Sequence, residues 1–200
     1  MKKLNFLVAG FCMIAVSLTS CLNSDNDSGS GLSKEEISFC LATVKGNYNG
    51  DLIYVAKNIK DVKDNTDTLK ISWSITNDST MTIYDFPAKL LADNISDEKL
   101  KAVLEEAPDQ DIACRIGFVN SQPVQYLINP KSPEYTLNHD GKDHKIQVAF
   151  YINNTTSFGS YNSTKKELYM QIVEGAIFMD GKQTAYLTKQ NPFAFVAKKD

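Results

Sequence analysis

Apolar and polar residues alternate with a period of two along most of the chain. Residues 69–75 alternate in this way, and a second run at 80–86 follows the polar stretch Asn77-Asp78-Ser79. Successive side chains of a strand point to opposite faces, and a short polar loop between two such runs is typical of a hairpin. The same pattern, with a turn at Asp180-Gly181, predicts further strands at 112–118, 124–128, 146–152, 167–174, 176–179, 184–187 and 193–197.

About ten strands follow from this pattern, and each of them is apolar on one side only. Antiparallel sheets with one covered face show this alternation, whereas parallel sheets need continuously apolar strands. We therefore expect a mainly β fold: an antiparallel barrel or strongly curved sheet with two short helices. The alternative is an α+β fold with an open antiparallel sheet that the helices cover.

Two segments carry helix signals instead. Ser33 and Glu36 form the pattern of a capping box, and an apolar stripe follows at Ile37, Cys40, Leu41 and Val44. The second helix is predicted to begin after Ser96 as N-cap and to end before Pro108. Its apolar face consists of Leu100, Val103, Leu104 and Ala107.

The N-terminus has the order of a secretory signal: Lys2 and Lys3, then an apolar segment at 4–18, then small residues before Cys21. The apolar segment is shorter than the roughly 20 residues that a membrane-spanning helix needs. Leu18-Thr19-Ser20-Cys21 resembles the lipobox of bacterial lipoproteins. This resemblance implies removal of residues 1–20 and attachment of palmitate-type acyl chains at Cys21. The alternative is an ordinary cleaved signal followed by a chance cysteine.

The polar, Gly/Ser-rich residues 21–31 are predicted to form a flexible tether, and 32–200 to form a single β-rich domain. Acyl chains on Cys21 would hold this domain at a membrane. Asp25 and Asp27 resemble the acidic signals that send Bacteroidetes lipoproteins to the cell surface. We therefore expect an outer-membrane lipoprotein of the cell envelope, and both a surface-exposed and a periplasm-facing location stay open.

The net charge of the chain bears on which partners it binds, and its cysteines bear on whether a disulfide forms. Without residues 1–20, the chain has 19 basic and 24 acidic residues and a formal charge of −5. This acidic balance disfavours nucleic acid as a partner. Cys40 and Cys114 remain in an oxidising compartment, where a disulfide between them can persist. The alternative is two unpaired thiols in the core, where cysteine is often buried.

The element Gly46-x-Tyr48-x-Gly50 follows the first predicted helix and opens the first strand. This layout resembles the opening of calycin-like lipoprotein domains. The whole chain is similar to uncharacterised Bacteroidetes lipoproteins of roughly 200 residues, which are classed as a domain of unknown function. The resemblance implies an anchored β-rich domain and carries no catalytic residue to this chain.

Two stretches contain candidate binding chemistry. His139 and His144 stand near two aspartates and could ligate a metal, but Asp140-Gly141 between them is also a plain hairpin turn with solvated side chains. The polar stretch 153–166 is predicted to be a long loop in which Phe158 and Tyr161 stack on a sugar or an apolar ligand. The alternative is that both rings cover the end of the sheet.

These observations favour a non-enzymatic, lipid-anchored binding or accessory domain for a small apolar or saccharide ligand in the mouth of a barrel. A structural subunit that contacts an outer-membrane protein partner is the first alternative, and a hydrolase is the second. No catalytic residue and no cofactor is predicted.

Overall fold

The computed structural model describes residues 31–56 and 65–199 of the chain. The predicted signal peptide, Cys21 and the predicted tether up to residue 30 lie outside these residues. Within the described ranges, no helix is both long and apolar enough to cross a membrane.

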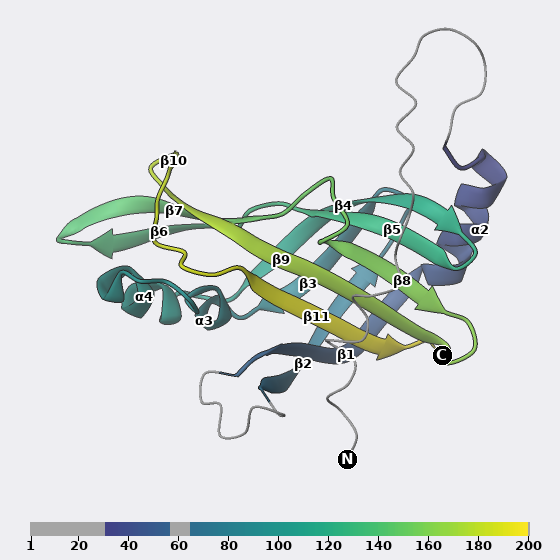
Figure 1. Cartoon of the computed structure of the whole chain (residues 1–200), viewed down its shortest axis with the longest axis horizontal. Coiled ribbons are helices and arrows are strands. Elements are labelled where there is room, and N and C mark those ends of the chain that lie inside the picture. Colours follow the sequence, from purple (N-terminus) through teal and green to yellow (C-terminus); the bar gives the residue numbers. More distant parts are fainter. Residues whose placement is uncertain (1–30, 57–64, 200) are drawn as a thin grey trace, which may run out of the picture.

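Eight antiparallel strands form a closed barrel (Figure 1). The order around the ring is β1, β2, β3, β4, β5, β8, β9 and β11, and β11 pairs with both β9 and β1. The predicted mainly β barrel is thus confirmed, and the alternative of an open sheet is wrong. The ring consists of β1 (Gly46–Val55), β2 (Thr66–Ile75), β3 (Thr80–Phe86), β4 (Gln110–Ser121), β5 (Val124–Pro130), β8 (Phe158–Asn162), β9 (Glu167–Met179) and β11 (Asn191–Lys198).

The long strand β9 leads out of the barrel. Its first part pairs with β8 and β11, whereas its last part pairs with β7 (Lys142–Phe150) and the short β10 (Lys182–Gln183). β6 (Glu134–His139) pairs in turn with β7. These strands therefore form an extension on the side of the ring away from α2, as Figure 1 shows.

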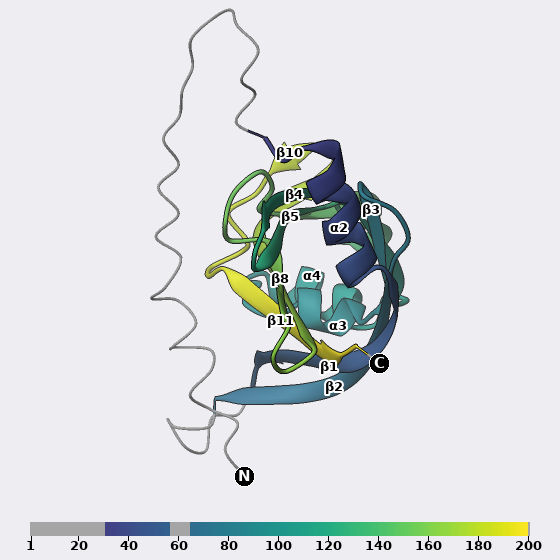
Figure 2. The ribbon, with the colours of Figure 1, turned by 90° about the vertical axis from the view of Figure 1, so that its right-hand side faces the viewer.

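Helix α2 (Lys34–Val44) covers one end of the barrel and faces the viewer in Figure 2. Both bonds of the predicted capping box are present, between Ser33 and Glu36. Cys40 and Val44 are the buried residues of this helix, and both are fully buried. The Tyr48 hydroxyl donates a hydrogen bond to the Val44 carbonyl over 2.5 Å, which ties the helix end to β1.

Helices α3 (Ala88–Leu91) and α4 (Glu98–Glu105) lie at the opposite end. The N-cap of α4 is Asp97, whose Oδ1 accepts a 2.8 Å hydrogen bond from the Leu100 N–H, so the predicted cap Ser96 is wrong. The Ser96 hydroxyl instead donates to the Tyr186 carbonyl. A tertiary contact thus decides between two adjacent residues that are both good caps.

Three predicted segments differ from the observed strands. The stretch 153–166, predicted as a loop, contains β8, which pairs with β5 and with β9. The runs 167–174 and 176–179, predicted as two strands, form the single strand β9. The strand predicted at 184–187 is wrong: β10, which pairs with β9, ends at Gln183, and Leu187 forms only an isolated bridge with Ile95. The neighbouring strands explain the first error, because their edges satisfy the main-chain groups of a segment whose own composition favours a loop.

Candidate functional site

Aromatic side chains of the chain itself occupy the barrel interior. Trp73 is fully buried, stacks on Tyr48 with ring centroids 5.5 Å apart, and contacts the edge of Phe195 at 5.9 Å. Gly50 makes room for them, because a Cβ there would lie 2.4 Å from the Val196 carbonyl oxygen and 2.6 Å from the Trp73 ring. Within the Gly-Tyr-Gly element, Tyr48 and Gly50 therefore serve close packing in this barrel.

Tyr126 fills the adjoining part of the interior. Burial raises the pKa of its hydroxyl well above the ordinary value of 10.0. Desolvation likewise raises the pKa of the Cys114 thiol to about 12. Both side chains belong to the buried hydrophobic core. The barrel interior is thus occupied by side chains of the chain itself.

Cys40 and Cys114 are both buried free thiols, so the structure shows the unpaired alternative and no disulfide between them. The Cys40 Sγ lies 3.7 Å from the Asn120 carbonyl oxygen, beneath α2. The Cys114 Sγ lies 3.6 Å from the carbonyl oxygen of Ile112, within its own strand. Raised thiol pKa values at both positions, caused first by desolvation, make them poor nucleophiles.

The predicted hairpin turn at Asp140-Gly141 is confirmed between β6 and β7, with positive φ at both residues. The expectation that its flanking side chains are solvated is wrong for His139, which is 7% exposed. Its Nε2 lies 3.1 Å from Asp97 Oδ1, whereas His144 Nδ1 lies 2.8 Å from Asp180 Oδ2.

Each histidine thus pairs with a carboxylate of a different element, and these pairs join the hairpin to the start of α4 and to the turn after β9. Among the described residues, no three or more histidine, cysteine, aspartate or glutamate side chains gather in a way that could hold a metal ion.

Phe158 and Tyr161 lie in β8 rather than in a loop. The Phe158 ring is 5.7 Å from the ring of Tyr169, whereas Tyr161 packs against the core. Residues three apart in a strand point to opposite faces. The two rings therefore do not form one stacking surface, and the predicted aromatic loop is wrong.

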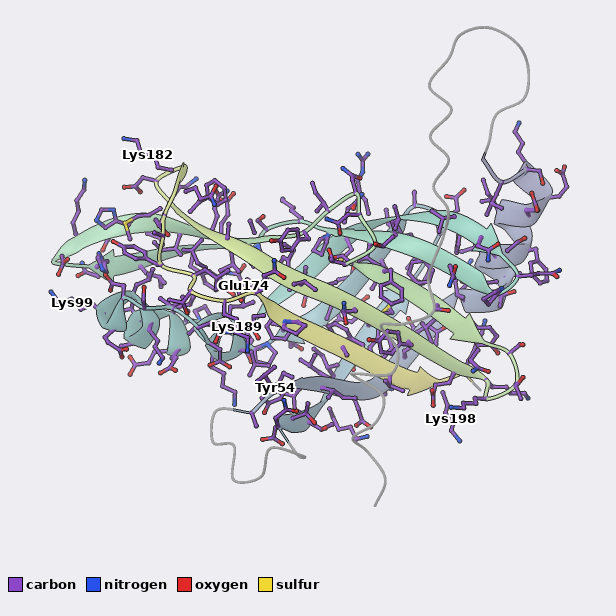
Figure 3. All side chains as sticks on the ribbon, in the orientation of Figure 1. Tyr54, Lys99, Glu174, Lys182, Lys189 and Lys198 are labelled. Atoms are coloured by element: carbon purple, nitrogen blue, oxygen red, sulfur yellow. The ribbon has the colours of Figure 1, made fainter. Side chains whose placement is uncertain are left out.

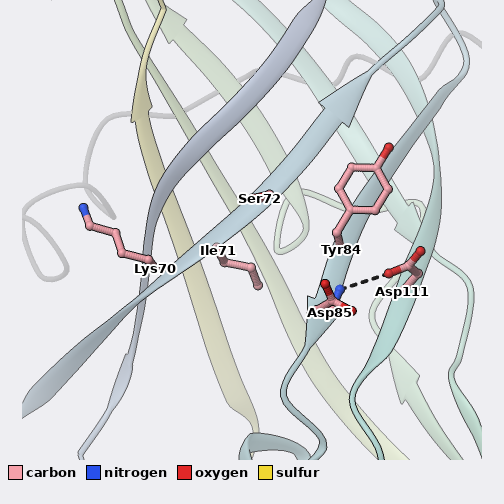
Figure 4. A pocket seen from close by; sticks show the side chains of 6 residues that line it. All are labelled: Lys70, Ile71, Ser72, Tyr84, Asp85 and Asp111. Carbon is pink, nitrogen blue, oxygen red and sulfur yellow. Dashed lines mark hydrogen bonds between the residues drawn. The ribbon is translucent and has the colours of Figure 1, made fainter.

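The barrel wall opens between β2 and β3. The two strands pair from Ser72 opposite Tyr84 to Ile75 opposite Met81, although β2 begins at Thr66. Figure 4 shows that they diverge beyond Ser72 and Tyr84.

A β-bulge in β3 marks the point of divergence. The pairing of β3 with β4 shifts between Ile83 and Phe86, and Asp85 has a φ of 48°, in the left-handed region. The Asp85 N–H donates to a carboxylate oxygen of Asp111 over 2.9 Å. Because bulges bend a strand and end pairing, this bulge accounts for the opening.

A pocket of about 550 Å³ lies in the opening, on the outer wall (Figure 4). Its volume is in the range of small-molecule sites. The Tyr84 ring is 38% exposed, and its hydroxyl lies 2.7 Å from Ser74 Oγ, which fixes its orientation. The lining residues are Lys70, Ile71, Ser72, Tyr84, Asp85 and Asp111.

The charge in this pocket is negative. The Lys70 ammonium group lies 2.5 Å from the Asp51 carboxylate, and its side chain extends away from Asp85 and Asp111 in Figure 4. Asp85 and Asp111 are both exposed. The arrangement combines two carboxylates, an exposed ring and a hydroxyl, which suits a ligand with hydrogen-bond donors or a positive charge.

A separate buried acid lies where the barrel meets α3. Glu174 is midway along β9, opposite the first residue of β11, and is fully buried (Figure 3). One carboxyl oxygen lies 3.5 Å from Asn191 Nδ2, and no hydrogen-bond partner reaches the other within the described part of the chain. Burial raises the pKa of this carboxyl well above its ordinary value. Glu174 does not line the pocket.

The pocket residues were not predicted from the sequence. One signal was available: the apolar inward positions are Met81 and Ile83, then Phe86, so the period of two shifts by one residue between them. Such a shift is typical of a bulge. It does not indicate which neighbouring strand loses its partner there.

Comparison with known proteins gives one family. A family described as a domain of unknown function (DUF4840) matches residues 43–179, well over half of the chain. No curated protein and no solved structure matches significantly. The matched range contains β1 to β9 and therefore every residue that lines the pocket. The chain belongs to the DUF4840 family.

Proposed function

We propose that this protein is a non-enzymatic binding domain of the cell envelope, anchored through acyl chains on Cys21, which takes its ligand at the outer-wall pocket between β2 and β3. The observation that carries this proposal is the contrast between a barrel interior packed with aromatic rings and a pocket in its wall. A ligand in the barrel mouth would have to displace Trp73 and Tyr126, which are fully buried.

The lining of the pocket favours a polar ligand over an apolar one. Asp85 and Asp111 supply acceptors, and Tyr84 supplies an exposed ring. An apolar ligand would desolvate both carboxylates without replacing their hydrogen bonds, which costs free energy. A saccharide or a peptide would satisfy them.

The sequence features of a lipid anchor support the same proposed function. The lipobox-like stretch ending at Cys21 and the Gly/Ser-rich residues up to 31 would leave the barrel tethered but free to meet ligands near a membrane. Such a tether raises the effective concentration of the domain at that surface.

Calorimetric titration of full-length protein in detergent micelles tests the pocket. The probes are a linear glucose hexasaccharide and short synthetic peptides. We expect at least one class to bind, and we expect Tyr84→Ala to weaken its binding about tenfold, as loss of a central ring does. Phe39→Ala is the matched control, since Phe39 is an exposed ring on α2. Binding that survives in Tyr84→Ala but not in Phe39→Ala would contradict this location.

A further inference from the structure

The pocket lies at one end of a longer feature, the open edge of β2. β2 pairs with β1 along its whole length, from Thr66 opposite Val55 to Ile75 opposite Gly46. On its other side, the pairing with β3 begins only at Ser72. Within the described part of the chain, residues 66–71 thus have a strand on one side only.

This open edge is about 20 Å long, at about 3.3 Å per residue. Along such an edge every second residue directs its main-chain N–H and C=O groups away from β1, and residues 67, 68 and 70 are exposed. One of the edge's donors, the Thr68 N–H, donates to Asp67 Oδ1 over 2.7 Å. Unpaired edges of this kind are templates for pairing with another chain. The length matches that of an average strand.

The negative charge of the pocket lies on the side of the opening opposite β2, on Asp85 of β3 and Asp111 of β4. Asp111 uses one carboxylate oxygen to accept from the Asp85 N–H, which leaves its second oxygen and the Asp85 carboxylate toward the pocket. The one lysine among the lining residues, Lys70, is paired with Asp51. A positive side chain in the pocket would therefore meet two carboxylates and one exposed ring, all of which attract cations.

We propose that an extended peptide segment of a partner protein adds to the open edge of β2 as a further strand and places a lysine or arginine side chain between Asp85 and Asp111. This inference rests on the proposed function and names its ligand class. Strand addition uses main-chain hydrogen bonds for affinity and a side-chain pocket for specificity, and both parts are present here. A saccharide would use the pocket but would leave the edge of β2 unpaired.

The test uses fluorescence anisotropy with the full-length protein in detergent micelles. The probe is a labelled eight-residue peptide of alternating threonine and valine with one central lysine. Two further probes replace that lysine by glutamate or methylate the main-chain nitrogens along one edge. We expect the lysine peptide to bind at least about tenfold more tightly than the glutamate peptide, and we expect N-methylation to abolish binding.

The protein variants remove charge without changing shape. We expect the double variant Asp85→Asn with Asp111→Asn to lose about tenfold in affinity for the lysine peptide. Asparagine tolerates the positive φ of residue 85 and keeps the acceptor at 111, so the bulge should persist. Asp78→Asn is the control, because this exposed acid lies in the turn at the other end of the β2–β3 hairpin. Equal binding of lysine and glutamate peptides would overturn the inference.

Other outcomes separate the two proposals. Binding of the hexasaccharide, lost in the double variant, with no peptide bound, would keep the pocket as the site and overturn the peptide inference. Concentration-dependent self-association lost in the double variant would show that a second copy occupies the edge, which also overturns it. Absence of binding by every probe would overturn both proposals.

Discussion

The ring of Tyr126 lies directly against Gly159, so closely that a Cβ on Gly159 would be 2.2 Å from Cζ of the tyrosine. These residues face each other across the pairing of β5 and β8. The contact shows how the barrel interior is filled: the ring of Tyr126 on β5 occupies the space that a side chain at position 159 on β8 would take.

Gly159→Ala should destabilise the barrel by about 1–3 kcal/mol, because the added methyl group overlaps the Tyr126 ring. The midpoint of urea unfolding measures this change. Gly117→Ala is the control, since a Cβ at that strand position meets no atom within 4 Å. We expect the control to stay within about 0.5 kcal/mol of the wild type. If Gly159→Ala proved as stable as the control Gly117→Ala, the barrel interior would have room for further atoms.

Asp97→Asn should lower stability near pH 7 but not in acid. The Leu100 N–H, and then His139, hold the pKa of the Asp97 carboxyl below its ordinary value of 3.8. A carboxyl with a lowered pKa in the folded state contributes stability above its unfolded pKa, and this contribution is lost as pH falls through the folded value. Asparagine is also a good N-cap, so the substitution removes charge and keeps the cap.

The measurement is the denaturation midpoint of wild type and Asp97→Asn at several pH values. The difference between them should be present at pH 6–7 and shrink below about pH 4. A difference that stays constant over this range would point to lost cap geometry rather than lost charge.

Glu174→Gln should show the opposite dependence. Burial raises the pKa of this carboxyl in the folded state, so folding takes up a proton. Its contribution to stability is fully present below the ordinary value of 4.5 and is lost as pH rises toward the folded pKa.

Glutamine mimics the neutral acid and lacks this slope, so the variant should gain on the wild type between pH 5 and pH 8. Unfolding midpoints at these two pH values measure the change. A wild type that gains on the variant toward pH 8 would mean that Glu174 is buried as a paired anion.

Cys21→Ala should release the protein from membranes. If Cys21 carries acyl chains, the wild type partitions into the detergent-rich phase of a cloud-point separation, and the variant partitions into the aqueous phase. Mass spectrometry of the mature N-terminus is the second readout, because acylation adds the mass of the lipid to a chain that begins at Cys21. An unmodified N-terminus in the aqueous phase would leave only an ordinary cleaved signal.

Local patterns were sufficient for much of the fold. The hairpin of β2 and β3, the turn at Asp140-Gly141 and the capping box of α2 were predicted correctly. Each depends on residues close together in the chain, where alternation, turn chemistry and side-chain caps act directly. The prediction of Ser96 as the N-cap of α4 failed for the complementary reason, since a contact with distant Tyr186 engages the serine and Asp97 caps the helix instead.

The sequence by itself determined that this chain forms antiparallel strands with one apolar face and two capped helices, because side-chain period and capping are local properties. Only the tertiary structure decided that β8 is a strand, that aromatic rings fill the barrel, and that the wall opens beside Asp85 and Asp111. Those features depend on which strands become neighbours and where their pairing stops. Pairing is set by contacts between residues far apart in the chain, which no local pattern encodes.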